Sequence, residues 1–158
     1  MKRGAGFTLI EIMVVLTIMG LGLTAVSLTF SSYLSRSAAR RAAEVFSQDL
    51  TVARNTASRS RQSVVLEFDE RELSYLIRVG TRNNDPILLT RSFGQDSDFN
   101  LTFLDLQMRR DEVTFNSRGV ADLSGAEEGP LGRAVFTAGN TTYAVSFNSM
   151  GSSRVEES

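Results

Sequence analysis

The feature that most constrains this chain is a long apolar stretch interrupted by one acid. Residues 7–30 contain a single charged side chain, Glu11. The run that follows it, residues 12–30, would span about 28 Å as a helix, which matches the hydrocarbon core of a bilayer. An unpaired carboxylate inside a bilayer costs about 2.5–3.5 kcal/mol. The stretch therefore predicts a transmembrane helix over residues 7–30 and a specific role for Glu11.

The composition excludes several kinds of chemistry. The 158 residues include no cysteine and no histidine, so disulfides, thiolate–imidazole zinc sites and Cys–His or Ser–His catalysis are ruled out. There is no nucleotide-binding loop pattern. We therefore expect a protein that is not an enzyme and that has no cofactor and no metal. Acidic residues in 83–85 and 96–98 could still offer oxygens to calcium, and that question stays open.

The residues before the apolar stretch are not those of an ordinary secretory signal. Such a signal has an apolar region of about 7–15 residues followed by a small-x-small cleavage site. Here the apolar stretch is longer and continues into helix-forming sequence. Basic residues lie on both sides of it, so the distribution of positive charge does not decide its orientation.

The N-terminal residues "KRGAGFTLIE" (2–11) resemble the class III leader and mature N-terminus of type IV pilins and type II secretion pseudopilins. The resemblance implies that a prepilin peptidase removes residues 1–6 by cutting after Gly6. The same enzyme would then methylate the new N-terminal residue, Phe7.

The resemblance also implies that Glu11 pairs with the α-amino group of Phe7, on a neighbouring subunit or on the same chain. A charge in apolar surroundings is tolerated when it is paired, so the pair would set the register of a subunit in a fibre. The alternative is an anchored protein that does not polymerise, in which Glu11 only suits the start of a helix.

The apolar stretch is expected to continue as one helix to about residue 58. Residues 31–62 contain no proline and no glycine and predict an amphipathic continuation, whereas Gly20 and Gly22 mark where the helix could bend. The apolar stripe at helical spacing comprises Ala39, Ala42, Ala43, Phe46, Leu50, Ala53 and Ala57. The polar residues expected largely off the stripe are Arg40, Arg41, Glu44, Gln48, Asp49 and Arg54.

From residue 63 onward, apolar residues recur at every second position instead of at helical spacing, which is typical of strands. Strands are predicted at 63–68, 73–79, 86–93, 100–104, 112–116, 132–138 and 141–148. Residues 138–140 predict a tight hairpin between the last two. We therefore expect an α+β protein with a pilin-like fold, in which a long N-terminal helix packs on a small antiparallel sheet or sandwich. The head would comprise residues 63–151, and the polar tail 152–158 would be flexible.

Three longer segments narrow the resemblance to the GspH/FimT family: "FSQDLTVARNTASRSRQSVVLEFD", "VTFNSRGVAD" and "YAVSFNSMGSSRV". Residues 115–119 and 149–155 fit the strand-end patterns of that family. The resemblance implies a minor pseudopilin of a type II secretion system, a subunit of the periplasmic pseudopilus that drives exoproteins through the outer-membrane secretin. Its anchor would lie in the bacterial inner membrane and its head in the periplasm. The implied partners are other major and minor pseudopilins, the prepilin peptidase, the inner-membrane assembly platform and membrane lipid.

The alternative within the resemblance is a FimT/FimU-like minor pilin of a type IV pilus, involved in pilus assembly, twitching or DNA uptake. Binding to DNA would need a basic, flexible end that contacts phosphate. Residues 149–158 hold one arginine and two glutamates, and the net charge is −1. Arg54, Arg59 and Arg61 are interpreted as a solvated helix end. Nucleic acid is therefore not an expected partner, and the choice between the two systems stays open.

Overall fold

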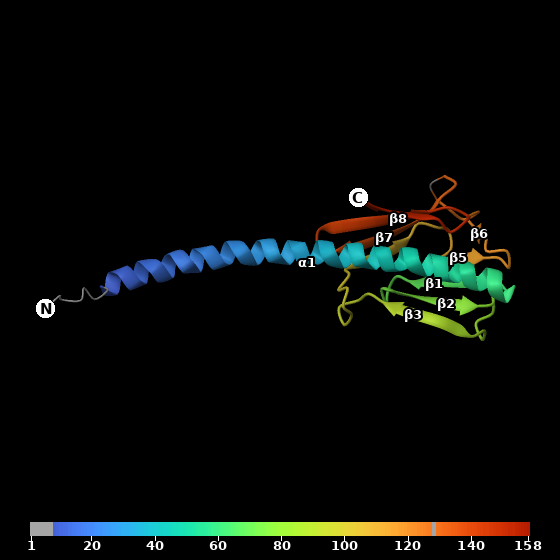
Figure 1. The fold of residues 1–158 in the computed structure, drawn as a ribbon, viewed down its shortest axis with the longest axis horizontal. Helices are drawn as coiled ribbons and strands as arrows, with labels where there is room; N and C mark the ends of the chain where they lie inside the picture. The colour runs from blue at the N-terminus through green and yellow to red at the C-terminus, as the bar shows by residue number, and fades with distance from the viewer. Residues whose placement is uncertain (1–7, 128) are drawn as a thin grey trace. The chain divides into compact units, whose positions relative to one another are not determined.

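The computed structural model describes the backbone of residues 8–127 and 129–158, with the side chains of residues 23–31 left out (Figure 1). Over these residues, one helix, α1 (Leu9–Ser60), is followed by nine strands. The chain divides into two compact units, Met1–Leu34 and Ser35–Ser158, so α1 contributes residues to both. Each unit is considered by itself.

In the first unit, α1 begins at a threonine cap. The side-chain oxygen of Thr8 accepts a hydrogen bond from the backbone N–H of Glu11 at 3.3 Å, which satisfies one of the unpaired donors at a helix start. The helix passes through Gly20 and Gly22 without a break, and bending at that point stays a prediction. Over the residues described here, no helix has the length and hydropathy required to cross a membrane. The predicted membrane segment 7–30 extends beyond the described side chains and also stays a prediction.

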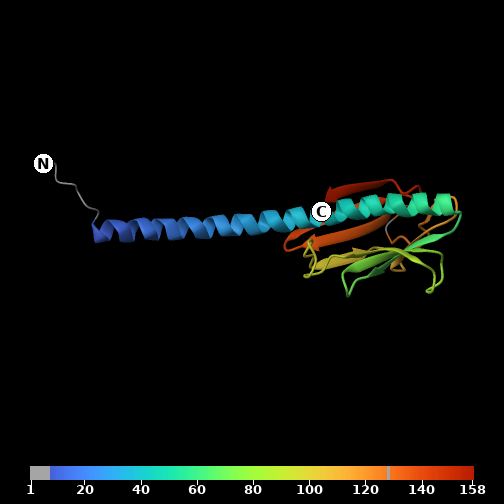
Figure 2. The same ribbon diagram turned by 60° about the horizontal axis from the view of Figure 1, so that its bottom comes forward.

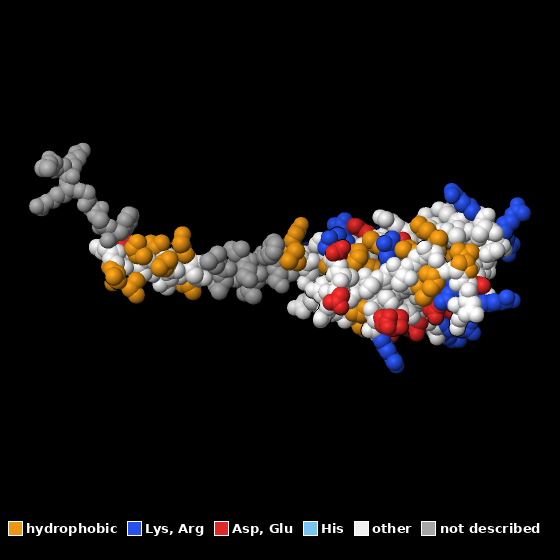
Figure 3. Space-filling view, turned by 90° about the horizontal axis from the view of Figure 1, so that it is seen from below, with side chains coloured by type: hydrophobic (Ala, Val, Ile, Leu, Met, Phe, Trp, Pro, Cys, Tyr) orange, Lys and Arg blue, Asp and Glu red, His pale blue; other side chains and the backbone are white. Residues whose placement is uncertain are grey.

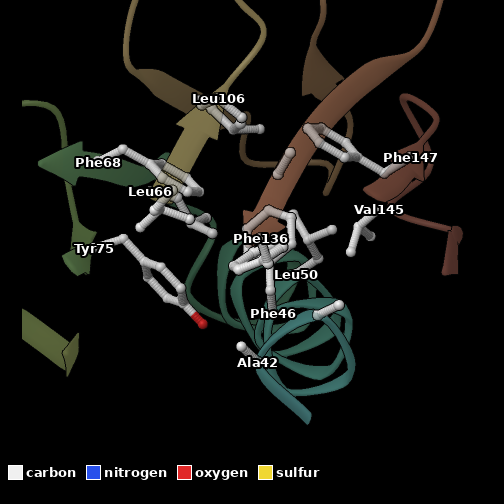
Figure 4. Packing of buried hydrophobic residues seen from close by; sticks show 14 of the residues in the cluster. Ala42, Phe46, Leu50, Leu66, Phe68, Tyr75, Leu106, Phe136, Val145 and Phe147 are labelled. Atoms are coloured by element: carbon white, nitrogen blue, oxygen red, sulfur yellow. The ribbon is translucent and has the colours of Figure 1, made fainter. Parts of the chain in front are cut away.

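In the second unit, the predicted apolar stripe of α1 is confirmed at every position. Phe46 and Leu50 point from the helix into the space between the two sheets (Figure 4). Alanine occupies most other stripe positions, and its small side chain lets the helix approach the strands closely. The residues of the stripe that are 0% exposed are Ala39, Ala42, Ala43, Phe46, Leu50, Ala53 and Ala57.

The strands form two antiparallel sheets that share this core with α1 (Figure 2). The five-stranded sheet has the order β3-β2-β1-β5-β6 and the four-stranded sheet the order β4-β7-β8-β9. The strands of the first are β1 (Val64–Asp69), β2 (Ser74–Val79), β3 (Ile87–Ser92), β5 (Glu112–Phe115) and β6 (Ala121–Asp122). Those of the second are β4 (Phe103–Leu106), β7 (Gly132–Ala138), β8 (Thr141–Phe147) and β9 (Ser153–Glu157). The expected α+β architecture is confirmed.

The alternation expected in the strands is confirmed for the core-facing residues of β1, although Val65 on the opposite face is also buried. In β1 the side chains of Val64, Leu66 and Phe68 are buried, and Leu66 lies opposite Ile77 of β2. The tight hairpin lies where it is predicted, because β7 ends at residue 138 and β8 begins at residue 141. Every second side chain of a strand points to the same face of the sheet, so one face of each sheet packs against the core.

The expectation of a flexible tail over residues 152–158 is wrong. Ser153–Glu157 forms β9, which pairs with β8 from Phe147↔Ser153 to Tyr143↔Glu157. The segment is polar apart from Val155, which packs against the core. An edge strand needs few apolar side chains, because backbone hydrogen bonds to its neighbour hold it in place.

Two further differences concern short strands. The two-residue strand β6 is not among the predicted strands, because a segment that short carries too little periodicity to recognise. The strand expected at 100–104 is displaced to Phe103–Leu106. Leu104 and Leu106 are both buried, so the apolar alternation continues past the predicted end of this strand.

Candidate subunit-assembly site

The described part of α1 in the first unit exposes apolar side chains at nearly every position from Leu9 to Leu21, and Figure 3 shows those on one face of the helix. Glu11 is also exposed, and it borders a shallow apolar hollow lined by Ile12, Val15 and Leu16. A helix that is apolar on every side requires a non-aqueous environment or other helices around it. The exposed residues are Leu9, Ile10, Ile12, Met13, Val14, Val15, Leu16, Ile18, Met19 and Leu21.

Glu11 also occupies a recognisable position at the helix start. Thr8 and Glu11 have the spacing of a capping box, in which an acid or amide sits three residues after a threonine cap. The backbone N–H of Glu11 donates to the Thr8 side chain, and an acid in the first turn suits the helix dipole. Gly6 and Phe7, the predicted cleavage and methylation residues, lie outside the described residues. The pairing of Glu11 with the Phe7 amine therefore stays a prediction.

The second unit contains a buried acid on the helix that was expected to lie largely off the apolar stripe. Asp49 is 3% exposed and accepts a hydrogen bond of 2.7 Å from the Tyr75 hydroxyl, which points toward the helix in Figure 4. Arg91 donates to both carboxylate oxygens, from Nε at 2.9 Å and from Nη2 at 3.3 Å. The expectation for Asp49 is wrong because these partners, on β2 and β3, compensate for its burial.

The protonation states of this cluster agree with its hydrogen bonds. Burial raises the pKa of Tyr75 far above its usual range, so its hydroxyl remains a donor to Asp49. The hydrogen bond to Asp49 raises the pKa of Arg91. Asp49 lies three residues after Phe46 and four before Ala53, and this spacing next to the apolar stripe was the available sign of its burial.

A second polar contact joins α1 to the other sheet. Arg36 donates from Nε to the Tyr143 hydroxyl at 3.4 Å and forms an ion pair with Glu157. These interactions, led by the hydrogen bond to Tyr143, raise the pKa of Arg36. Since Tyr143 and Glu157 belong to β8 and β9, polar contacts attach the helix to both sheets.

The acidic residues considered for calcium do not form a metal site among the described residues, which contain no suitable group of three or more ligands. In the turn after β1, Asp69 accepts hydrogen bonds from the N–H groups of Arg71 and Glu72. Asp85 accepts one from the N–H of Arg82. These acids stabilise turns by accepting hydrogen bonds from backbone N–H groups. Whether the protein binds calcium at other residues stays open.

A long helix packed by its alanine stripe on two antiparallel sheets defines a pilin-like fold. Residues 42–154 match the family model described as type II transport protein GspH, and residues 1–27 match the prokaryotic N-terminal methylation motif. The chain therefore belongs to the GspH family. It is a pilin-like structural subunit and not an enzyme.

Solved structures of EpsH and FimU resemble the chain. EpsH is the minor pseudopilin from the type 2 secretion system of Vibrio cholerae, with 15% identity, a TM-score of 0.50, and coverage of 75% of this chain and 96% of EpsH. FimU is a type IV minor pilin of Pseudomonas aeruginosa, with 17% identity, a TM-score of 0.53, and coverage of 80% of this chain and 92% of FimU. No curated protein sequence matches the chain. At these identities the likeness establishes the fold alone.

Proposed function

We propose that this protein is a minor pseudopilin of a type II secretion system, a subunit of the periplasmic pseudopilus that drives exoproteins through the outer-membrane secretin. The observation that carries the proposal is the GspH family match over residues 42–154, combined with the N-terminal methylation motif. The exposed apolar helix around Glu11 supports it.

In this proposal, residues 7–30 anchor the chain in the inner membrane and the head lies in the periplasm. The prepilin peptidase cuts after Gly6 and methylates Phe7. Cleavage creates an α-amino cation at the edge of the apolar zone, and Glu11 provides the opposite charge. A correctly docked subunit pairs both charges, whereas a slipped subunit leaves both unpaired in an apolar environment, where each is costly.

The head would move as one body with the second-unit part of the helix. The stripe is fully buried there, and Asp49 and Arg36 add polar contacts to the two sheets. A displacement imposed on this part of α1 is therefore transmitted to the strands. The partners in such a fibre would be other major and minor pseudopilins, supported by the inner-membrane assembly platform.

The test is a clean deletion of the gene in its own host, scored together for proteins released to the medium and for twitching or transformation. The proposal expects exoprotein release to be lost with motility intact, and to return when the gene is supplied again. Intact release with lost twitching or DNA uptake would overturn it.

That second outcome would support a type IV minor pilin instead. The likeness to FimU, which covers 80% of this chain at a TM-score of 0.53, favours this alternative. Since FimU and EpsH score almost equally, the paired readout is needed to distinguish the two systems.

A further inference from the structure

The head contains one five-residue pattern twice. Residues 115–119 read Phe-Asn-Ser-Arg-Gly and residues 147–151 read Phe-Asn-Ser-Met-Gly. Phe115 is the last residue of β5 in the five-stranded sheet, and Phe147 is the last residue of β8 in the four-stranded sheet. Each phenylalanine lies opposite the residue six positions later, Ala121 or Ser153. The two sheets therefore end in the same loop, which returns the chain to an antiparallel strand.

In the first loop, the side-chain oxygen of Asn116 accepts hydrogen bonds from the N–H groups of Arg118 at 2.9 Å and Val120 at 3.2 Å. The N–H of Gly119 donates to the Asn116 carbonyl at 2.8 Å, and the N–H of Asn116 donates to the Val120 carbonyl at 2.9 Å.

The second loop repeats all four bonds. The side-chain oxygen of Asn148 accepts from Met150 at 3.0 Å and Ser152 at 3.1 Å. The N–H of Gly151 donates to the Asn148 carbonyl at 2.9 Å, and that of Asn148 to the Ser152 carbonyl at 3.0 Å. The glycines match as well, with φ of 75° at Gly119 and 73° at Gly151. The loops therefore share one backbone geometry.

Both loops pack against the same residue of α1, Arg54. A methyl group built on Gly119 would lie 2.3 Å from Ser58 Oγ and 3.2 Å from Arg54 Cγ, and one on Gly151 would lie 3.1 Å from Arg54 Cδ. The two loops also touch each other, because the N–H of Ala121 donates to the Ser149 carbonyl at 2.7 Å. The aliphatic part of Arg54 thus packs against both glycines.

We propose that these two loops act together as a clamp on the last turns of α1, with Arg54 as the residue that both of them hold. The clamp joins the helix, the five-stranded sheet and the four-stranded sheet at one point. Opening either loop would remove one side of the packing around Arg54 and weaken the bond between Ala121 and Ser149. The second loop should therefore loosen when the first is broken, even though its own sequence is unchanged.

The first test is amide hydrogen exchange on the full chain in detergent micelles, comparing Asn148→Ala with the wild-type protein. Removing the acceptor in the second loop is expected to speed exchange at Gly119 and Ala121, in the first loop region, by about tenfold. Asn148→Asp keeps the acceptor oxygen and should restore protection. Asn140→Ala, an exposed asparagine in the turn between β7 and β8, is the matched control and should change neither loop. Faster exchange confined to the altered loop would overturn the proposal.

The second test is a cycle of Asn116→Ala, Asn148→Ala and the double variant, followed by denaturant unfolding. A shared clamp predicts that the double variant lowers the folding equilibrium constant by less than the product of the two single effects, since either change already opens the clamp. The same cycle in an Arg54→Ala background should move closer to multiplicative, because the bond between Ala121 and Ser149 is then the remaining link between the loops. A multiplicative result with Arg54 present would show two independent turns and contradict the clamp.

Discussion

The two parts of helix α1 differ in what covers their apolar side chains. In the first unit, Leu16 is 62% exposed and Ile18 is 64% exposed, whereas Leu50 in the second unit is 0% exposed. The side chains differ in the same way, since bulky leucine, isoleucine, valine and methionine surround the first part and alanine dominates the buried stripe of the second. The small side chain of alanine lets a helix pack closely against a fixed protein surface. Bulky apolar residues on all sides suit lipid or neighbouring helices.

The largest expected effect comes from a matched pair of leucines on this helix. Leu50→Ala should lower the free energy of unfolding of the head by about 2–5 kcal/mol, because it leaves a cavity in the core. Leu16→Ala should change the same quantity by less than about 0.5 kcal/mol, since the residue does not contribute to that core. Denaturant unfolding of both full-length variants measures the difference, and equal losses would contradict the contrast between the two parts.

The next effect concerns the buried acid of the second unit. Asp49→Ala removes the acceptor of Tyr75 and Arg91 and should cost about 1.5–3 kcal/mol. The cost stays in this range because the Arg91 side chain is 40% exposed and can turn to water. Tyr75→Phe removes one hydrogen bond and should cost about 1 kcal/mol. If Asp49→Ala proved neutral in denaturant unfolding, the cluster would not help to hold the helix on the sheet.

The smallest effect is a pH dependence at Glu70, in the turn between β1 and β2. Partial desolvation, followed by a hydrogen bond with Asp105, raises the pKa of Glu70. The folded state therefore holds this proton more tightly, and the resulting stability is present at acid pH and lost as pH rises through the raised pKa. Because Glu70 is exposed, Glu70→Gln should alter stability by only about 0.5 kcal/mol or less.

The measurement for Glu70 is the free energy of unfolding between pH 4 and pH 8. The variant should lose less stability than the wild-type protein as pH rises through this range. Glu72→Gln, which alters an exposed acid in the same turn, is the matched control for the loss of one carboxylate. An identical slope for Glu70→Gln and the wild-type protein would contradict the assignment.

The spacing of apolar residues in the sequence predicted the helix stripe and most strands, because this spacing determines which side chains face the core. It did not predict β9, since Ser153–Glu157 is held by pairing with β8 and the partner of a polar edge strand is set by the tertiary fold. It also placed Asp49 off the apolar stripe and did not predict its burial, because the compensating Tyr75 and Arg91 come from strands distant in sequence. For the candidate assembly site, a motif indicated Gly6, Phe7 and Glu11. The pairing of Glu11 with Phe7, on a neighbouring subunit or on the same chain, stays a prediction because Phe7 lies outside the described residues.

The central claim, that Glu11 acts through its charge in subunit docking, is tested most directly by Glu11→Gln in the native host. Glutamine keeps the capping-box pattern with Thr8 but removes the charge. Crosslinking of the processed chain to neighbouring subunits should be lost in Glu11→Gln as in Glu11→Ala, with membrane insertion unchanged, whereas Thr8→Ala should retain most of it. If Glu11→Gln assembles like the wild-type protein, Glu11 serves only to start the helix and the proposed docking role is contradicted.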